Sequence, residues 1–277
     1  MSMLTHAHAL PFDPSAARPD LRDGGRARSR ATITTHAPGA DIDAYRDKYG
    51  KEEGEAKFFR DVPILSEQDA GTNLFMFGGV SNLWECLIGN GGAGSLQYFN
   101  NANAYIAVGD GGPSALSGTA SVTNGSASIT TSASQTSLIG NYLTFTGDST
   151  YQAYLVASGS GTAWTLSTTY GGTTNATISF SEILGPVGTQ TDLQASTNKY
   201  RQAMNATYPT HTDGTTSGAA TITWQATFGT ANANFAWYEF AIANASTAGR
   251  ILNRHVQWNG IKANTNSLTF TITTTIS

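Results

Sequence analysis

Apolar and polar residues alternate most regularly in the last quarter of the chain. Every second residue from 222 to 228 is apolar, a similar run surrounds Trp237, and the run 268–276 sets apolar residues among threonines. Because strand side chains project to alternate faces, each run presents one apolar face to a core. No helical pattern is comparably strong. The sequence therefore predicts an all-β fold, an antiparallel β-sandwich or barrel body with one or two short helices, whose last run is tied into a sheet.

Residues 118–182 differ from both flanks. Turn signals such as Asn124-Gly125, Gly147-Asp148 and Gly159-Ser160-Gly161 separate short β-like runs, at 119–123, 126–131, 142–146, 151–157, 163–168 and 174–180. This punctuation predicts a small β-barrel or sandwich with its own core. The flanks, 71–117 and 183–277, would join without it. We therefore expect residues 118–182 to be a domain inserted into a loop of the main β body.

Helical patterns are short. Apolar residues at positions 42, 45 and 49 share one helical face within the charged segment 41–70, which we expect to be a partly helical linker with a solvated charged face. Apolar positions 83, 84, 87 and 88, followed by glycines, predict a helix packed on the sheet. The apolar spacing within 193–204 predicts one more short helix.

Residues 1–40 are expected to form an extended arm. Prolines between positions 11 and 38 disfavour helix, and arginines alternate with aspartates and glycines. Such a segment cannot order itself by apolar burial, so it is either a disordered tail or an arm that orders on a neighbouring molecule. Spaced apolar anchors favour the arm, and deleting 1–40 should leave the body folded. The expected contact residues are Leu10, Phe12, Arg18, Leu21, Arg22, Arg26, Arg28 and Arg30.

Charge is concentrated at the start of the 277-residue chain. The first 69 residues hold 10 of the 15 Lys and Arg and 12 of the 19 Asp and Glu, which leaves 12 charged residues among the other 208. A net charge of −4 distributed in this way offers no basic surface for nucleic acid. The sequence shows neither a signal peptide nor an 18-residue apolar span, so no membrane is expected. Cys86, the single cysteine, is expected to be a small buried hydrophobe.

The sequence contains no spacing that indicates a catalytic or metal site. Nucleophile-elbow, zinc-protease and phosphate-loop motifs are missing, and the seven carboxylates after residue 69 give thin support for glycoside hydrolysis. We expect no enzyme, no cofactor and no metal. Glu239 and Arg254 stand out because each lies in a strongly apolar strand context, where an unpaired buried charge is costly. They are predicted to form a structural ion pair, within the fold or across a subunit boundary.

The β body resembles a structural protein of tailed-bacteriophage virions. The resemblance spans roughly 73–111 and 190–277 and is carried by NAYIAVGDG at 103–111, TDLQ at 191–194, YRxxM at 200–204, YP at 208–209, TWxxxFG at 223–229, ANFAWxE at 233–239 and LNR at 252–254. Residues 118–182 resemble small β modules shared among phage head and tail appendages. Residues 1–70 lie outside the resemblance.

The resemblance implies a virion location, as a decoration, cement, tail or fibre component. A charged arm ahead of a compact neutral body favours a capsid decoration (cement) protein, made in the host cytoplasm, that binds the major capsid protein at the capsid surface and stabilises the shell, as a homotrimer where capsomers meet. Two alternatives stay open. One is a tail or fibre protein whose inserted domain binds a receptor or glycan, and the other is a glycan depolymerase on an appendage.

Overall fold

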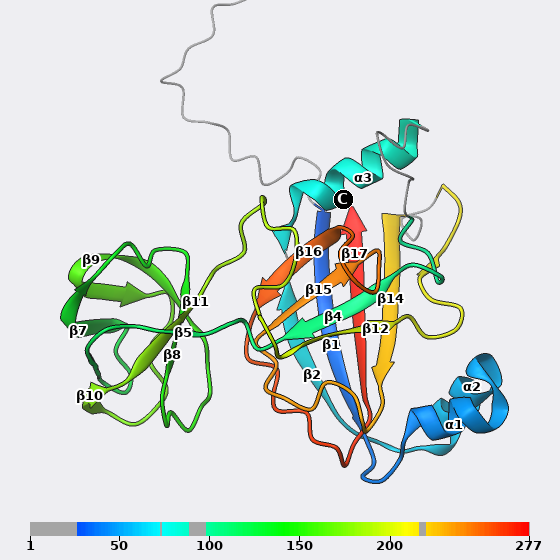
Figure 1. Cartoon of the computed structure of the whole chain (residues 1–277), viewed down its shortest axis with the longest axis horizontal. Helices are drawn as coiled ribbons and strands as arrows, with labels where there is room; N and C mark the ends of the chain where they lie inside the picture. The colour runs from blue at the N-terminus through cyan, green and yellow to red at the C-terminus, as the bar shows by residue number, and fades with distance from the viewer. Residues whose placement is uncertain (1–26, 73, 89–97, 216–219, 277) are drawn as a thin grey trace, which may run out of the picture.

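The computed structural model describes residues 27–72, 74–88, 98–215 and 220–276 (Figure 1). Its strands form three antiparallel sheets, of which two have five strands and one has seven. The two five-stranded sheets enclose one apolar core, and three helices accompany them. The predicted all-β class, with an antiparallel sandwich body, is confirmed.

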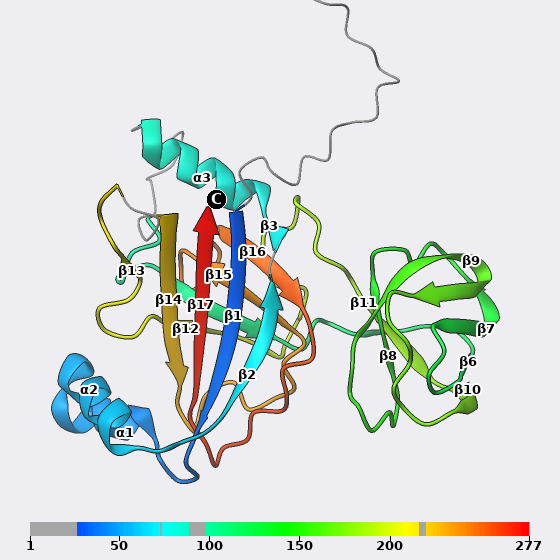
Figure 2. The same ribbon diagram turned by 180° about the vertical axis from the view of Figure 1, so that it is seen from behind.

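The first sheet brings the two ends of the described chain together. Its strand order is β13-β14-β17-β1-β2, and Figure 2 shows the four long strands side by side. The bounds are Thr210–His211 for β13, Thr221–Phe228 for β14, Leu268–Ile276 for β17, Ala27–His36 for β1 and Ile64–Thr72 for β2. As predicted, the run 268–276 is a strand held within a sheet.

Threonines line the face of this sheet that points away from the core. The hydroxyl oxygens of Thr221 and Thr275 lie 3.1 Å apart, and those of Thr223 and Thr273 lie 3.4 Å apart. Trp224 and Phe270 point to the opposite face, into the core. The alternation read from the sequence therefore separates a hydroxyl-bearing outer face from an apolar inner one.

Strand β1 corrects the expectation that residues 1–40 form an arm. β1 lies between β17 and β2, and Ala31 and Ile33 are 0% and 3% exposed in the main core. The sequence does not reveal this strand because its buried stripe has only these two apolar members, and because its partner strand lies at the far end of the sequence. Only residues 1–26, outside the described residues, could still act as an arm, and deleting 1–40 would remove a central strand.

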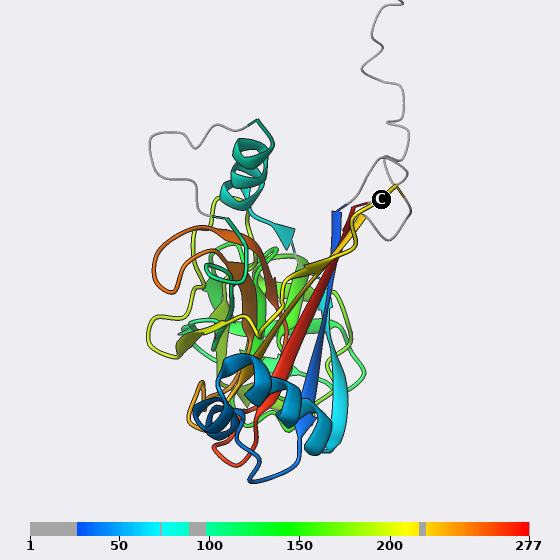
Figure 3. The same ribbon diagram turned by 90° about the vertical axis from the view of Figure 1, so that its right-hand side faces the viewer.

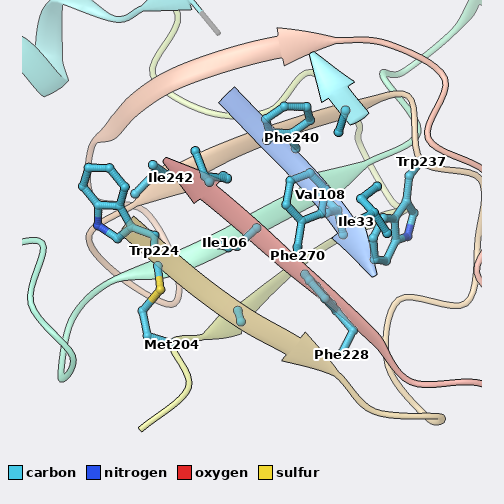
Figure 4. Packing of buried hydrophobic residues seen from close by; sticks show 14 of the residues in the cluster. Ile33, Ile106, Val108, Met204, Trp224, Phe228, Trp237, Phe240, Ile242 and Phe270 are labelled. Atoms are coloured by element: carbon cyan, nitrogen blue, oxygen red, sulfur yellow. The ribbon is translucent and has the colours of Figure 1, made fainter. Parts of the chain in front are cut away.

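The second sheet completes the sandwich. Its order is β12-β4-β15-β16-β3, with bounds Lys199–Ala203, Tyr105–Gly109, Glu239–Ala243, Ile251–Val256 and Leu74–Phe75 respectively. Figure 4 shows the core between the sheets, where Ile106 and Phe240 of this sheet meet Phe270 of the first. The rings of Phe240 and Phe270 have centroids 4.8 Å apart.

The short helix expected within 193–204 is wrong. Residues 199–203 form β12, which pairs with β4 from Lys199 opposite Gly109 to Ala203 opposite Tyr105. Leu193 and Met204 are both buried, but they belong to two different apolar clusters. Their helical spacing was therefore coincidental, and pairing with β4 overrode local preference.

Helices cover two ends of the sandwich (Figure 3). The bounds are Ile42–Tyr49 for α1, Lys51–Asp61 for α2 and Phe77–Ile88 for α3. α1 and α2 occupy the charged linker as predicted, although residues 64–70 belong to β2. Gly54 lets the two helices meet, because a Cβ there would collide with the backbone of Tyr45. α3 begins ahead of the expected position 83, and Cys86 within it is half-buried, not fully buried.

The third sheet is built from residues 114–183, called here the inserted domain. Its order is β10-β6-β7-β9-β8-β11-β5, with bounds Asn175–Ile178, Ala120–Val122, Ser128–Gln135, Tyr154–Leu166, Tyr142–Phe145, Phe180–Ile183 and Ser114–Ala115 respectively. The sheet surrounds its own apolar cluster, which contains Phe145 and Trp164. The turn expected at 159–161 is instead part of β9, and β5 and the end of β11 extend beyond the predicted 118–182.

Candidate functional site at the joint between the two β units

Glu239 and Arg254 meet inside one chain, where the inserted domain joins the body. They lie on the neighbouring strands β15 and β16, with Arg254 Nε 2.6 Å from Glu239 Oε2. Both side chains are 0% exposed. A buried pair of this kind gains little over an apolar pair, but removing one partner leaves an uncompensated charge.

The pair holds the segment that returns from the inserted domain. Glu239 accepts hydrogen bonds from the backbone N–H groups of Gln194, at 3.0 Å, and Ala195, at 2.7 Å. Arg254 Nη1 donates to the carbonyl of Leu184 at 3.0 Å. Arg254 Nη2 is buried without a hydrogen-bond partner among the described residues. Two charged side chains therefore hold the main chain at Leu184, Gln194 and Ala195 against β15 and β16.

Gly109 makes room for this arrangement. It pairs with Glu239 across β4 and β15, and a Cβ at this position would lie 2.7 Å from Glu239 Oε1. The carboxylate would then have to leave the backbone donors of Gln194 and Ala195. A glycine at the end of β4 is thus part of the site.

Three aromatic residues form a second contact between the two units. The rings of Tyr151 and Trp258 stack with centroids 5.3 Å apart and planes at 22°, and Tyr238 lies 4.8 Å from Trp258. The Tyr238 hydroxyl donates to the carbonyl of Tyr151 at 2.9 Å. Burial raises the pKa of Tyr238 to about 12, so this hydroxyl keeps its proton at neutral pH. We call Tyr151, Tyr238 and Trp258 the aromatic seam.

Most of the expected arm residues lie outside the described residues. These are Leu10, Phe12, Arg18, Leu21, Arg22 and Arg26. Arg28 lies in β1 opposite Thr275. Arg30 is an exposed residue of the same strand, and its Nη2 lies 3.0 Å from Asp69 Oδ2. Arg28 and Arg30 therefore belong to a strand and not to an extended arm, and the capsid-contact role of the eight residues stays a prediction.

Sequence reasoning missed a buried ionic network beneath the α1–α2 hairpin. Arg46 Nη2 lies 2.7 Å from Glu55 Oε1 and 3.1 Å from Asn205 Oδ1, and Glu55 and Asn205 are 3% and 1% exposed. Arg46 Nη1 also binds Asp43, at 2.9 Å. The charges of segment 41–70 alone predict a solvated helix face. The signal that could have found this network is the helical spacing of Glu55 with Phe58, which is also buried.

The ranges that the structure describes contain neither a cluster of metal ligands nor a membrane-spanning helix. No three His, Cys, Asp or Glu side chains in those ranges gather as metal ligands would. No helix within them is long and apolar enough to cross a bilayer.

Comparisons with known proteins give no relative. No family model, no curated protein and no solved structure matches the chain. Support for a function must therefore come from the residues and contacts themselves.

Proposed function

We propose that the protein is a structural component of a tailed-bacteriophage virion, a decoration protein that binds the major capsid protein at the surface of the head. The residues at 73–111 and 190–277 that resemble virion proteins support this location. The structural support is one observation, namely how the N-terminal segment is attached to the body.

Strand β1 provides that attachment. It pairs from Ala27 to Thr35 with β17 and from Arg30 to His36 with β2. A pull on residue 26 along the strand axis is therefore shared by two ladders, and many backbone hydrogen bonds must break together. Residues 1–26 have the firm anchorage that a tether to a shell requires.

The joint and the seam suit the same role. Glu239 and Arg254 fix the root of the inserted domain, and Tyr151 of that domain contacts Tyr238 and Trp258 of the body. The inserted domain extends from one side of the sandwich (Figure 1). It would project from the capsid surface in a defined direction. A homotrimer seated where capsomers meet is the arrangement we propose, because closed cyclic symmetry matches such sites.

Binding to purified shells that lack the protein tests the proposal. We expect saturable binding by the full chain and by a variant in which a short linker replaces residues 114–183. A chain beginning at Ala27 should lose binding while keeping the melting temperature of the body. Undiminished binding by that chain would remove the N-terminal segment from the mechanism.

Copy number separates the rival positions. A particle reconstruction should show many copies distributed over the head. A few copies confined to the tail tip or a fibre would contradict the proposal and favour a receptor-binding or glycan-binding role for the inserted domain. Oligosaccharide released from host polysaccharide by the purified protein would indicate an enzyme.

A further inference from the structure

Four large apolar side chains are exposed close to one another at the joint. Leu74 and Phe77 are 47% and 69% exposed, and Leu184 and Val187 are 47% and 53% exposed. We call these four residues the joint patch. Single exposed apolar residues are ordinary on protein surfaces, whereas a contiguous set marks a surface that another group covers.

Pairings and hydrogen bonds around Arg254 bring together the segments that carry the joint patch. Leu74 pairs with Arg254 across β3 and β16, and Arg254 Nη1 binds the carbonyl of Leu184 at 3.0 Å. The N–H of Phe77 donates at 2.9 Å to the carbonyl of the residue that follows Val187. Figures 1 and 2 agree that the linker after β11 passes the start of α3.

The first described residues, at the start of β1, lie beside the joint patch. Arg30 pairs with Thr72 at the end of β2, and β1 continues upstream to Ala27. Leu74, the first residue of the patch, follows Thr72 by two positions. The 26 residues that precede Ala27 are therefore connected to the body next to an uncovered apolar surface, and they carry their own large apolar residues.

We propose that residues 1–26 fold back and cover the joint patch of the same chain in the free protein, with Phe12 and Leu21 as anchors. Leu21 is six residues from Ala27 and can reach about 20 Å from it, and Phe12 can reach about 50 Å. Both distances keep the anchors close to their own body. A tether this short gives an effective concentration on the order of millimolar, so the chain's own segment displaces a second copy present at micromolar concentration.

Own-chain docking has a regulatory consequence. The N-terminal segment is withheld from other surfaces until a partner competes for it, and the patch is shielded from self-association until then. The inference concerns the free protein, so failure of shell binding would refute the proposed function and leave this docking intact.

Photocross-linking tests the docking in the full-length protein. A photoreactive benzoylphenylalanine placed at Val187 should cross-link to peptides from residues 1–26. In an equal mixture of ¹⁴N- and ¹⁵N-labelled protein, the cross-linked peptide pairs should carry one label only. The same probe at Ile261, which is 62% exposed elsewhere on the body, is the matched control and should not capture the segment.

Paired substitutions make the test specific. F12S with L21S, or L74S with F77S, should reduce the cross-link yield about tenfold or more, because each pair removes two apolar contacts. Leu74 and Phe77 are exposed, so an unchanged melting temperature is expected for the second pair. Mixed-label pairs would assign the patch to a second copy and overturn own-chain docking. A lack of cross-links to 1–26, or yields unaffected by either pair, would also overturn it.

Discussion

The body and the inserted domain are both antiparallel β structures, but they join their strands across very different distances in the sequence. In the body, β1 pairs with β17, so that residue 27 lies opposite residue 276. Every ladder of the inserted domain joins residues between 114 and 183. Two segments that are distant in the sequence must first be brought together, at a cost in chain entropy, before their pairing can stabilise the fold. The body therefore depends on its two ends meeting, whereas the inserted domain can form from neighbouring hairpins.

The two units also differ in what they bury. The body encloses Glu239, Arg254 and Glu55, and each charge is held by an ion pair and by backbone or amide groups. The inserted domain buries the carboxylate of Asp148, which is held by a hydroxyl group: its Oδ2 accepts a hydrogen bond from Thr150 at 2.7 Å. A charged interior makes the body sensitive to single substitutions, because a buried charge left without its partner is strongly destabilising.

Removing β1 should produce the largest difference in stability between the body and the inserted domain. A chain beginning at Ala37 loses both ladders of β1 and the buried Ala31 and Ile33, so the body should lose its cooperative unfolding transition. The inserted domain should keep its own transition, which can be followed through the resolved ¹⁹F resonance of Trp164 in protein labelled with 5-fluorotryptophan, because Trp164 is the one tryptophan between residues 114 and 183. A chain beginning at Ala27 is the control and should show both transitions. An unchanged body transition in the shorter chain would contradict the dependence of the body on its first strand.

Substituting Glu239 should have the next largest effect, a loss of unfolding free energy in the body. Glu239→Ala leaves Arg254 buried without its partner, and we expect the body to lose about 3–5 kcal/mol of unfolding free energy. Asp69→Ala breaks an exposed pair with Arg30 and should cost less than about 1 kcal/mol. Chemical denaturation of both variants measures the difference. Equal losses of unfolding free energy in the two variants would mean that burial of the Glu239–Arg254 pair has no energetic consequence. A loss confined to the Trp164 transition would place the effect in the wrong unit.

The same contrast explains which elements the sequence could predict. β6, β7, β8 and β14 were found because their signals are local, consisting of alternating residues and nearby turn residues. β9 was predicted as two runs, because the glycines at 159 and 161 resemble a turn. Strand β1 was missed because its evidence lies in β17, at the other end of the chain. The false helix at 193–204 arose because Leu193 and Met204 pack into separate clusters, which a one-dimensional pattern cannot distinguish.

The candidate site was predictable only in part. Glu239 and Arg254 could be singled out, because a charge in an apolar strand demands a partner. Nothing local pointed to the backbone donors of Gln194 and Ala195, or to the carbonyl of Leu184, since these depend on where the returning linker runs. The aromatic seam was equally hidden, because it joins residues of both units.

Weakening the aromatic seam should have a smaller effect and should separate the two units. Tyr238→Phe removes the hydrogen bond to Tyr151 and should cost about 0.5–1.5 kcal/mol. The loss should weaken the coupling between the unfolding transitions of the two units. The midpoint of each unit's own transition should change little. Tyr98→Phe, an exposed tyrosine outside the seam, is the matched control. Calorimetry that found stronger coupling in Tyr238→Phe would contradict a role for the seam in joining the units.

Acidification should destabilise the body more than the inserted domain, by the smallest of these effects. Burial lowers the pKa of His36 and of His255, and all five histidines of the chain lie outside residues 114–183. His36 Nε2 lies 2.8 Å from Thr269 Oγ1, and its ring meets Phe58 edge-on, so a charged imidazole is unfavourable there.

The direction of the pH effect follows from these lowered values. The unfolded chain binds a proton near pH 6.5 whereas the folded chain binds it only at lower pH, so body stability should be constant above about pH 6.5 and fall below it. His36→Gln should flatten this fall, while His211→Gln, at an exposed position in β13, should not. Melting of the two transitions between pH 7 and pH 5 measures the effect. A Trp164 transition that fell as steeply as that of the body would show that carboxylates common to both units, and not the buried histidines, govern the response.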